Sequence, residues 1–147
     1  MKTPKIKNLI AVGLLSAFAT TANAQDLNIS VTNLTQGIHF TPLMVAAHNA
    51  DTALFTVATT ASSELQMMAE GGDVSGLATQ LTAAAADMVA NPAEGLLAPA
   101  GNTSFSLTTV DGNNYLSLTA MMLPTNDGFV GLDSWMIPTA AGTYTVW

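Results

Sequence analysis

Alternating hydrophobic and polar residues predict strands in the first and last thirds of the chain. Between Asp26 and Leu34, the apolar residues Leu27, Ile29 and Val31 alternate with polar ones, which is the period of a half-buried strand. Further extended segments are predicted at 38–47, 53–57, 103–110, 115–123 and 142–147. The first of these, 38–47, contains Pro42, which cannot donate to a ladder and therefore indicates an edge or a bulge.

Turn residues separate these strands. Thr35-Gln36-Gly37 is typical of a turn, and Asp111-Gly112 followed by Asn113-Asn114 is typical of a hairpin. We therefore expect 103–110 and 115–123 to be the two arms of one hairpin.

The middle of the chain has helical periodicity instead. Ser62 or Ser63 can cap a helix that runs to Glu70, and Ser63 and Gln66 have capping-box spacing. Gly71-Gly72 ends this helix, and a second helix is predicted from about residue 75 to 89, before Asn91-Pro92. The fold class that follows is mainly β, an antiparallel β-sandwich with a short helical insertion at about residues 62–90.

Residues 1–24 are interpreted as a secretory signal peptide. Lys2, Lys5 and Lys7 form a basic start, the apolar run 9–18 is too short to span a bilayer, and 22–24 (ANA) is a small-x-small cleavage pattern. We expect Gln25 as the mature N-terminus and one domain over 25–147. The alternative is a membrane anchor or a buried N-terminal helix.

Charge is distributed unevenly, and this narrows the range of partners. The three lysines are the whole Lys+Arg count, and all ten Asp and Glu residues lie between Asp26 and Asp133. Removal of residues 1–24 would change the formal net charge from −7 to −10. Such a surface should be soluble and should bind neither nucleic acid nor anionic lipid. The absence of cysteine excludes disulfides, thiol catalysis and thiolate metal sites.

Few residues could serve as catalytic bases. His39 and His48 are the only histidines, and no G-x-S-x-G elbow is present. One or both histidines are interpreted as structural, hydrogen-bonded to the backbone. Glu94 and the acids of 70–73 have the character of solvated loops, so the sequence predicts that this protein is not an enzyme.

Acidic residues near the end of the chain suggest a metal site. Asp127 lies in the polar loop 124–128, and Asp133 follows soon after. Short acidic loops at one end of a sandwich can supply oxygen ligands to Ca²⁺, although acids also occur in turns for backbone reasons.

The chain resembles the spondin N-terminal (F-spondin-type) domain family, in particular its bacterial secreted members, over nearly all of residues 25–147. The residues that support the resemblance are 33–35 (NLT) before Gly37, 40–42 (FTP), Ala47-His48, Leu54-Phe55, Ala61-Ser62, Ala69-Glu70, Gly72 and 122–131 (MLPTNDGFVG). No single piece is specific, but their order and spacing together are.

The resemblance implies a C2-like antiparallel β-sandwich, an adhesive or binding role outside the cell, and bound Ca²⁺. It places a metal-ligating Asp of the family on Asp127. The other family carboxylates come from a D-A-G-T-D/E motif after the next strand, and this chain contains no D-A-G-T sequence. Either the domain is truncated at its C-terminus and lacks its last strand or strands, or this protein has lost the site. A truncated domain should be less stable than an extended form. Position 128 is also Gly where many animal members have Trp.

Two classes of function remain open. The first is an exported, non-enzymatic binding or adhesion module of the periplasm or the medium, whose partner is an extracellular or envelope protein or glycan, with structural calcium in full-length relatives. The alternative is a periplasmic metal-dependent hydrolase that uses Asp127, Asp133 and a histidine; it would need an open coordination site.

Overall fold

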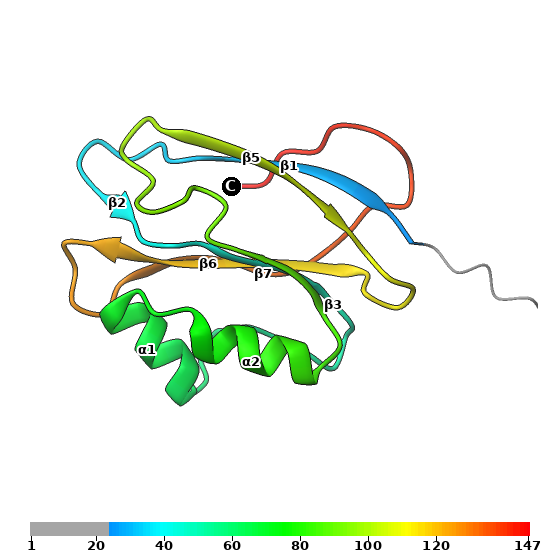
Figure 1. The fold of residues 1–147 in the computed structure, drawn as a ribbon, viewed down its shortest axis with the longest axis horizontal. Coiled ribbons are helices and arrows are strands. Elements are labelled where there is room, and N and C mark those ends of the chain that lie inside the picture. Colours follow the sequence, from blue (N-terminus) through cyan, green and yellow to red (C-terminus); the bar gives the residue numbers. More distant parts are fainter. Residues whose placement is uncertain (1–23) are drawn as a thin grey trace, which may run out of the picture.

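Strands dominate the computed structural model, which describes residues 24–147 (Figure 1). The strands are β1 (Asp26–Thr32), β2 (His39–Phe40), β3 (Met44–His48), β4 (Asp87–Ala90), β5 (Asn102–Thr108), β6 (Tyr115–Leu123) and β7 (Phe129–Met136), and the helices are α1 (Ser63–Gly71) and α2 (Ser75–Ala83). All strand pairs are antiparallel. The predicted mainly β class is therefore confirmed, while the predicted signal peptide lies outside the described residues except for Ala24.

Two sheets of unequal width form the sandwich. The smaller sheet contains β1 and β5, and the larger has the order β2-β6-β3-β4 with β7 also paired to β6. In Figure 1 the smaller sheet lies on one face of the larger sheet, and both helices lie on the opposite face. The helical insertion is therefore an outer layer and leaves the sandwich interior to the strands.

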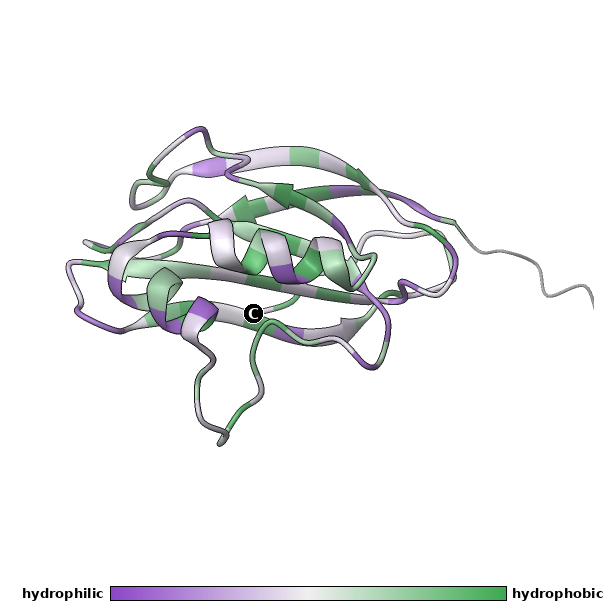
Figure 2. Ribbon diagram, turned by 60° about the horizontal axis from the view of Figure 1, so that its bottom comes forward, coloured by the Kyte–Doolittle hydropathy of each residue, from purple (hydrophilic) through white to green (hydrophobic). Residues whose placement is uncertain are grey.

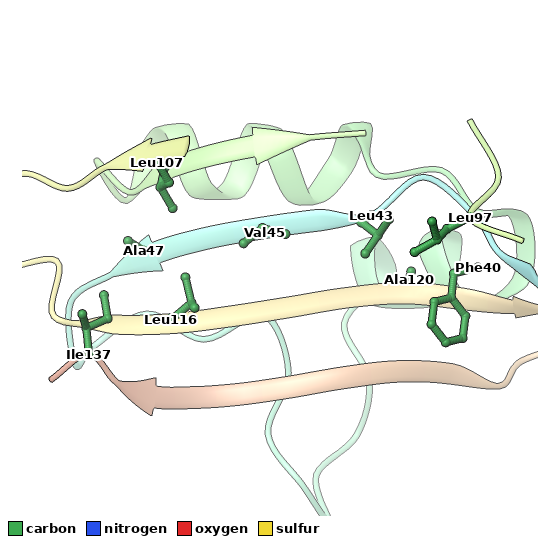
Figure 3. Packing of buried hydrophobic residues seen from close by; sticks show 9 residues of the cluster. All are labelled: Phe40, Leu43, Val45, Ala47, Leu97, Leu107, Leu116, Ala120 and Ile137. Carbon is green, nitrogen blue, oxygen red and sulfur yellow. The ribbon is translucent and has the colours of Figure 1, made fainter. Parts of the chain in front are cut away.

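Side chains along β3 and just before it point alternately to the two faces of the larger sheet, and each face has its own hydrophobic core. Leu43, Val45 and Ala47 point into the core between the sheets, where Leu107 of β5 and Leu116 of β6 meet them (Figure 3). The opposite face packs against the helices and is rich in methionine. Its fully or almost fully buried members include Met44, Met68, Met121, Leu65, Leu77 and Leu81.

The α1 helix begins and ends where its sequence predicts. Ser62 is the N-cap, and its Oγ accepts a hydrogen bond from the Leu65 N–H at 3.1 Å. Gly72 ends the helix with a φ of 68°, and its N–H donates to the Met68 carbonyl. A Cβ at Gly72 would also lie 2.9 Å from the Thr41 Cβ, so close packing requires glycine here as well.

The prediction for the second helix was wrong at its C-terminal end. The α2 helix ends at Ala83, and Asp87–Ala90 forms β4 instead. Local propensity favours helix in the alanine-rich stretch, but the pairing of Val89 with Val45 on β3 adds a strand to the larger sheet. Tertiary pairing therefore overrides propensity.

The predicted hairpin around Asp111-Gly112 was also wrong. The chain does turn there, and Gly112 has a φ of 93°, but β5 pairs with β1 while β6 pairs with β2, β3 and β7. The turn instead moves the chain from one sheet to the other. It is attached to β4 by Asp87, whose Oδ2 accepts hydrogen bonds from the Val110 N–H at 2.7 Å and the Asn113 Nδ2 at 2.9 Å.

Three further segments differ from prediction. Residues 53–57 form no strand and belong to the loop between β3 and α1, which projects from the molecule in Figure 2. Residues 142–147 form no strand either and are exposed. The sequence pattern missed β7, because a bulge opposite Ser117 shifts the alternation after Leu132, with Ser134 at a φ of 47°.

Across residues 24–147, neither helix has the length and apolar character that crossing a membrane requires.

Candidate functional site

The loop that contains the predicted metal ligand joins β6 to β7 and is held together by one threonine. The Thr125 hydroxyl donates to the Met122 carbonyl at 2.6 Å and accepts from the Gly128 N–H at 3.1 Å. The Met122 N–H in turn donates to the Gly128 carbonyl at 2.8 Å, which closes the loop. The Leu123–Pro124 peptide bond in this loop is cis.

Gly128 is required by this closure. A Cβ at this position would lie 2.7 Å from the Thr125 Oγ1, which is closer than real Cβ atoms approach. Many animal members of the family that the chain resembles have Trp at this position. In this chain, the closed loop requires glycine.

Asp127 is exposed at the tip of this loop, as is its neighbour Asn126. Its carboxylate accepts no hydrogen bond from the described residues, so both oxygens are available to solvent or to a cation. The predicted loop placement of Asp127 is thus confirmed, while its role as a ligand stays a prediction.

The surroundings of Asp127 supply few charged ligands for a calcium cage. Protein Ca²⁺ sites use six to eight oxygens, commonly several of them carboxylate. In residues 24–147, no group of three His, Asp or Glu side chains is placed so that it could hold one ion. Asp127, Asp133 and a histidine therefore do not form the cluster that a metal-dependent hydrolase would need within this part of the chain.

His48 lies inside the molecule, at the end of β3. It is 1% exposed, and its Nδ1 and Nε2 lie 2.8 Å from the Asn49 carbonyl and the Ser117 hydroxyl respectively. The Ser117 Oγ also accepts from the Ser134 N–H at 2.9 Å, so the side chain supports the β7 bulge. Both ring nitrogens have protein partners, and the hydrogen bond to the backbone that was predicted for His48 is confirmed.

The remaining candidates are dispersed. His39 lies half-buried on β2, beside Pro124 at a shallow and mainly apolar hollow. Glu70 and Asp73 are exposed near the junction of the two helices, and Glu94 is an exposed turn residue with a φ of 55°. None of these acids is brought beside Asp127 in a metal-binding group of the described residues.

A separate hollow lies between the β3–α1 loop and the helices. Its volume is about 450 Å³, and residues 53–62, Leu65, Gln80 and Phe129 line it. Phe55 and Phe129 meet edge to face there, with ring centroids 5.2 Å apart. No carboxylate lines it, so the predicted metal ligand and this hollow are separate features.

Sequence reasoning missed the buried polar residues that hold the loops in place. Asn33 is fully buried, and its Nδ2 donates to the carbonyls of Ile38 at 2.8 Å and Leu97 at 3.0 Å. The Thr41 hydroxyl accepts from the Met121 N–H at 3.1 Å, beside Gly72. Only the asparagine-threonine spacing before Gly37, typical of a turn, could have indicated Asn33 from the sequence.

These residues also explain the pieces on which the family resemblance rests. Asn33, Thr41, His48 and Gly72 all belong to those pieces, and each holds a loop or a layer in place. The shared pattern is therefore one of architecture rather than of a catalytic constellation.

Comparison with known proteins gives one positive result. None of the curated proteins compared with the chain matches it. The family model described as Spondin_N matches residues 29–145, which is most of the chain and includes every strand from β2 onward and most of β1. The chain therefore belongs to the spondin N-terminal domain family.

Proposed function

We propose that this protein is an exported, non-enzymatic binding or adhesion module, which acts in the periplasm or after secretion. The observation that supports this most strongly is the family match over residues 29–145. Domains of this family are generally non-catalytic and typically extracellular. The partner class is an extracellular or envelope protein or glycan.

The chemistry of the side chains agrees with a binding role. His48 has both ring nitrogens occupied inside the molecule, and no three Asp, Glu or His side chains of the described residues are grouped so that they could hold a metal ion. A molecule of this kind offers surfaces and edges to a partner, and its rigid sheets would hold them in fixed positions.

Export and binding can be tested together. Tagged protein is purified from the periplasm and the medium of the producing cells, and its N-terminal residue is determined. It is then immobilised and incubated with envelope and medium fractions. We expect Gln25 at the N-terminus and selective retention of one protein or glycan without its chemical turnover.

The control is an unrelated exported domain of similar negative charge. Retention no stronger than by this control, or a protein that keeps Met1, would contradict the proposed function.

Asp127 is the only residue that we propose as a calcium ligand. We propose that its free carboxylate contributes to cation binding in this loop, with most of the coordination supplied by groups other than the Asp, Glu and His side chains of residues 24–147. Calorimetric titration with CaCl₂ should give weak binding that Asp127→Asn reduces by about tenfold, since it removes the only charged ligand.

Asp51→Asn is the matched control, because it removes one exposed carboxylate from a different turn. Equal affinities of the wild type and Asp127→Asn, or no binding by the wild type, would overturn the assignment of Asp127.

A further inference from the structure

The smaller sheet is too narrow to cover the larger one. Only β1 and β5 lie above a sheet to which β2, β3, β4, β6 and β7 contribute (Figure 1). Apolar side chains of β7 that face the smaller sheet, among them Val130, Leu132 and Trp135, are only half-buried. The apolar residues of β1 that face the same core, Leu27, Ile29 and Val31, are also half-buried.

One backbone edge of β1 is open. At the two ends of the β1–β5 ladder, the Thr109 N–H donates to the Gln25 carbonyl at 2.8 Å and the Asn33 N–H donates to the Gly101 carbonyl at 2.9 Å. Hydrogen-bonded pairs alternate along antiparallel strands, so Leu27, Ile29 and Val31 bond to β5. The backbone groups directed away from β5 belong to Asp26, Asn28, Ser30 and Thr32; we call these the open edge.

The two sides of the smaller sheet differ in how they are covered. On the β5 side, Asp87 accepts from the Val110 N–H at 2.7 Å, and the Thr103 hydroxyl donates to the Pro92 carbonyl at 2.9 Å. On the β1 side, no backbone group of the open edge bonds to another described segment. Tyr144 reaches Trp135 on β7, with ring centroids 6.2 Å apart, but residues 142–147 remain exposed and unpaired.

The open edge also lacks the usual protection against strand addition. Natural edge strands are often blocked by lysine, proline or a bulge. None of these is present in β1, and its only charged residue is Asp26 at its start. A further strand could therefore pair with β1 and cover the half-buried side chains.

The charge of the molecule indicates which kind of strand could pair with the open edge. Residues 24–147 contain all ten carboxylates and no Lys or Arg. Both flanking strands contribute exposed acids, Asp26 on β1 and Asp133 on β7. A second copy would meet like charge, whereas a basic strand would be attracted.

We propose that the open edge of β1 binds an extended, cationic segment of a partner protein by β-strand addition. Backbone hydrogen bonds provide the affinity, alternate apolar side chains of the segment cover Val130 and Trp135, and its basic residues meet the acidic surface. This inference rests on the proposed binding function and specifies the surface and the partner chemistry.

The test uses a synthetic strand-forming peptide, KTVKVTVKT, titrated into the isotope-labelled protein. We expect the amide signals of Asn28, Ser30 and Thr32 to shift, and those amides to become protected from hydrogen exchange. The acidic peptide ETVEVTVET should bind about tenfold or more weakly, because it meets like charge.

Ser30→Pro and Ser30→Ala form a matched pair of variants. Both remove the Ser30 hydroxyl, which accepts from the Asn102 Nδ2 at 2.8 Å, but only proline removes the outward N–H. Proline at this position leaves the bonds to β5 intact. We expect about a tenfold loss of peptide affinity for Ser30→Pro relative to Ser30→Ala, as removal of a backbone donor from the new ladder predicts.

A modified peptide makes the test independent of protein stability. Methylation of alternate amides on the side that faces β1 should abolish binding to the wild-type protein, and methylation on the other side should not. Equal binding of the two methylated forms, or equal affinity of the two Ser30 variants, would overturn the proposal. Concentration-dependent dimerisation that protects the same amides without peptide would overturn the choice of a cationic partner.

These outcomes are separable from those of the capture assay. Partner retention that persists in Ser30→Pro refutes only the assignment to the open edge, whereas absence of any partner for the wild type refutes the proposed function itself.

Discussion

Buried polar side chains determine how the loops of this molecule join its strands. Asn33 connects the end of β1 to the backbone at Ile38 and Leu97, and its Oδ1 accepts from the Thr35 N–H at 3.0 Å and hydroxyl at 2.7 Å. In the same way, Ser117 links His48 to the bulge of β7. Such residues bring together segments that are distant in sequence, so no local pattern predicts them.

Asn33→Ala should lower the free energy of unfolding by about 2–3 kcal/mol. The change removes the two hydrogen bonds that the Asn33 side chain donates to the carbonyls of Ile38 and Leu97. Chemical denaturation measures this directly. Asn28→Ala is the matched control on the outer face of β1, where the side chain accepts only from the Ser106 hydroxyl at 3.0 Å. A cost of about 0.5 kcal/mol or less is expected there, and equal costs for the two variants would contradict the role of Asn33.

The candidate site was predictable only in part at this scale. The loop position of Asp127 follows from its Pro- and Gly-bounded sequence, and the structure places it in that loop. The Thr125 hydroxyl that closes the loop, and the close approach that requires Gly128, depend on three-dimensional contacts that spacing does not encode.

At the scale of elements, the helices depend on carboxylates at their starts. The Glu64 backbone N–H and the hydroxyls of Ser63 and Ser62 hold the pKa of the Glu64 carboxyl below its ordinary value of 4.5. The Ser75 backbone N–H and hydroxyl likewise lower the pKa of Asp73 below 3.8. A lowered pKa in the folded state means that the charged form stabilises the helix start.

This coupling predicts a pH dependence with a definite sign. The contribution of Glu64 is fully present above pH 4.5, where the unfolded chain is ionised, and is lost as the pH falls through the lower folded value. Thermal midpoints should therefore show Glu64→Gln and Asp73→Asn to be less stable than the wild type at pH 7, with the differences shrinking as the pH falls below the ordinary pKa values of the two carboxyls.

Glu70→Gln is the control for this pair, since Glu70 lies in the last turn of α1, where a negative charge is unfavourable. This variant should not lose stability at pH 7. Destabilisation equal to that of Glu64→Gln would show that the effect does not depend on position along the helix.

Elements defined by local chemistry were predictable, and those defined by pairing were not. The α1 helix follows from Ser62, its apolar face and Gly72, and β1 follows from simple alternation. By contrast, β4 arises from a helix-favouring stretch because β3 pairs with it, and β7 has its alternation broken by a bulge. The Asp111-Gly112 turn was found, but which sheet receives each arm depends on the whole fold.

At the scale of the whole molecule, unbalanced charge opposes the compact state. The described chain has ten Asp and Glu residues and no Lys or Arg to offset their charge. Its stability must come from the two apolar cores, because general ion pairing is not available to residues 24–147. Screening of like charges should therefore help folding.

Raising NaCl from about 20 to about 300 mM should accordingly increase the thermal midpoint at pH 7, since the screening length shortens well below the size of the molecule. The double variant Asp51→Asn with Glu70→Gln carries less negative charge and should show a smaller response. A midpoint that falls with salt, or an undiminished response in the double variant, would argue against self-repulsion.

The methionine-rich contact between the helices and the larger sheet gives the protein a particular sensitivity to oxidants. The thioethers of Met44 and Met68 are fully buried, whereas Met67 and Met136 are 47% and 62% exposed. Exposed methionines can become sulfoxides without disturbing the layers, but a polar sulfoxide at Met68 would separate α1 from the sheet. Each transient lifting of the helices in the presence of an oxidant would then risk chemical damage that prevents them from closing again.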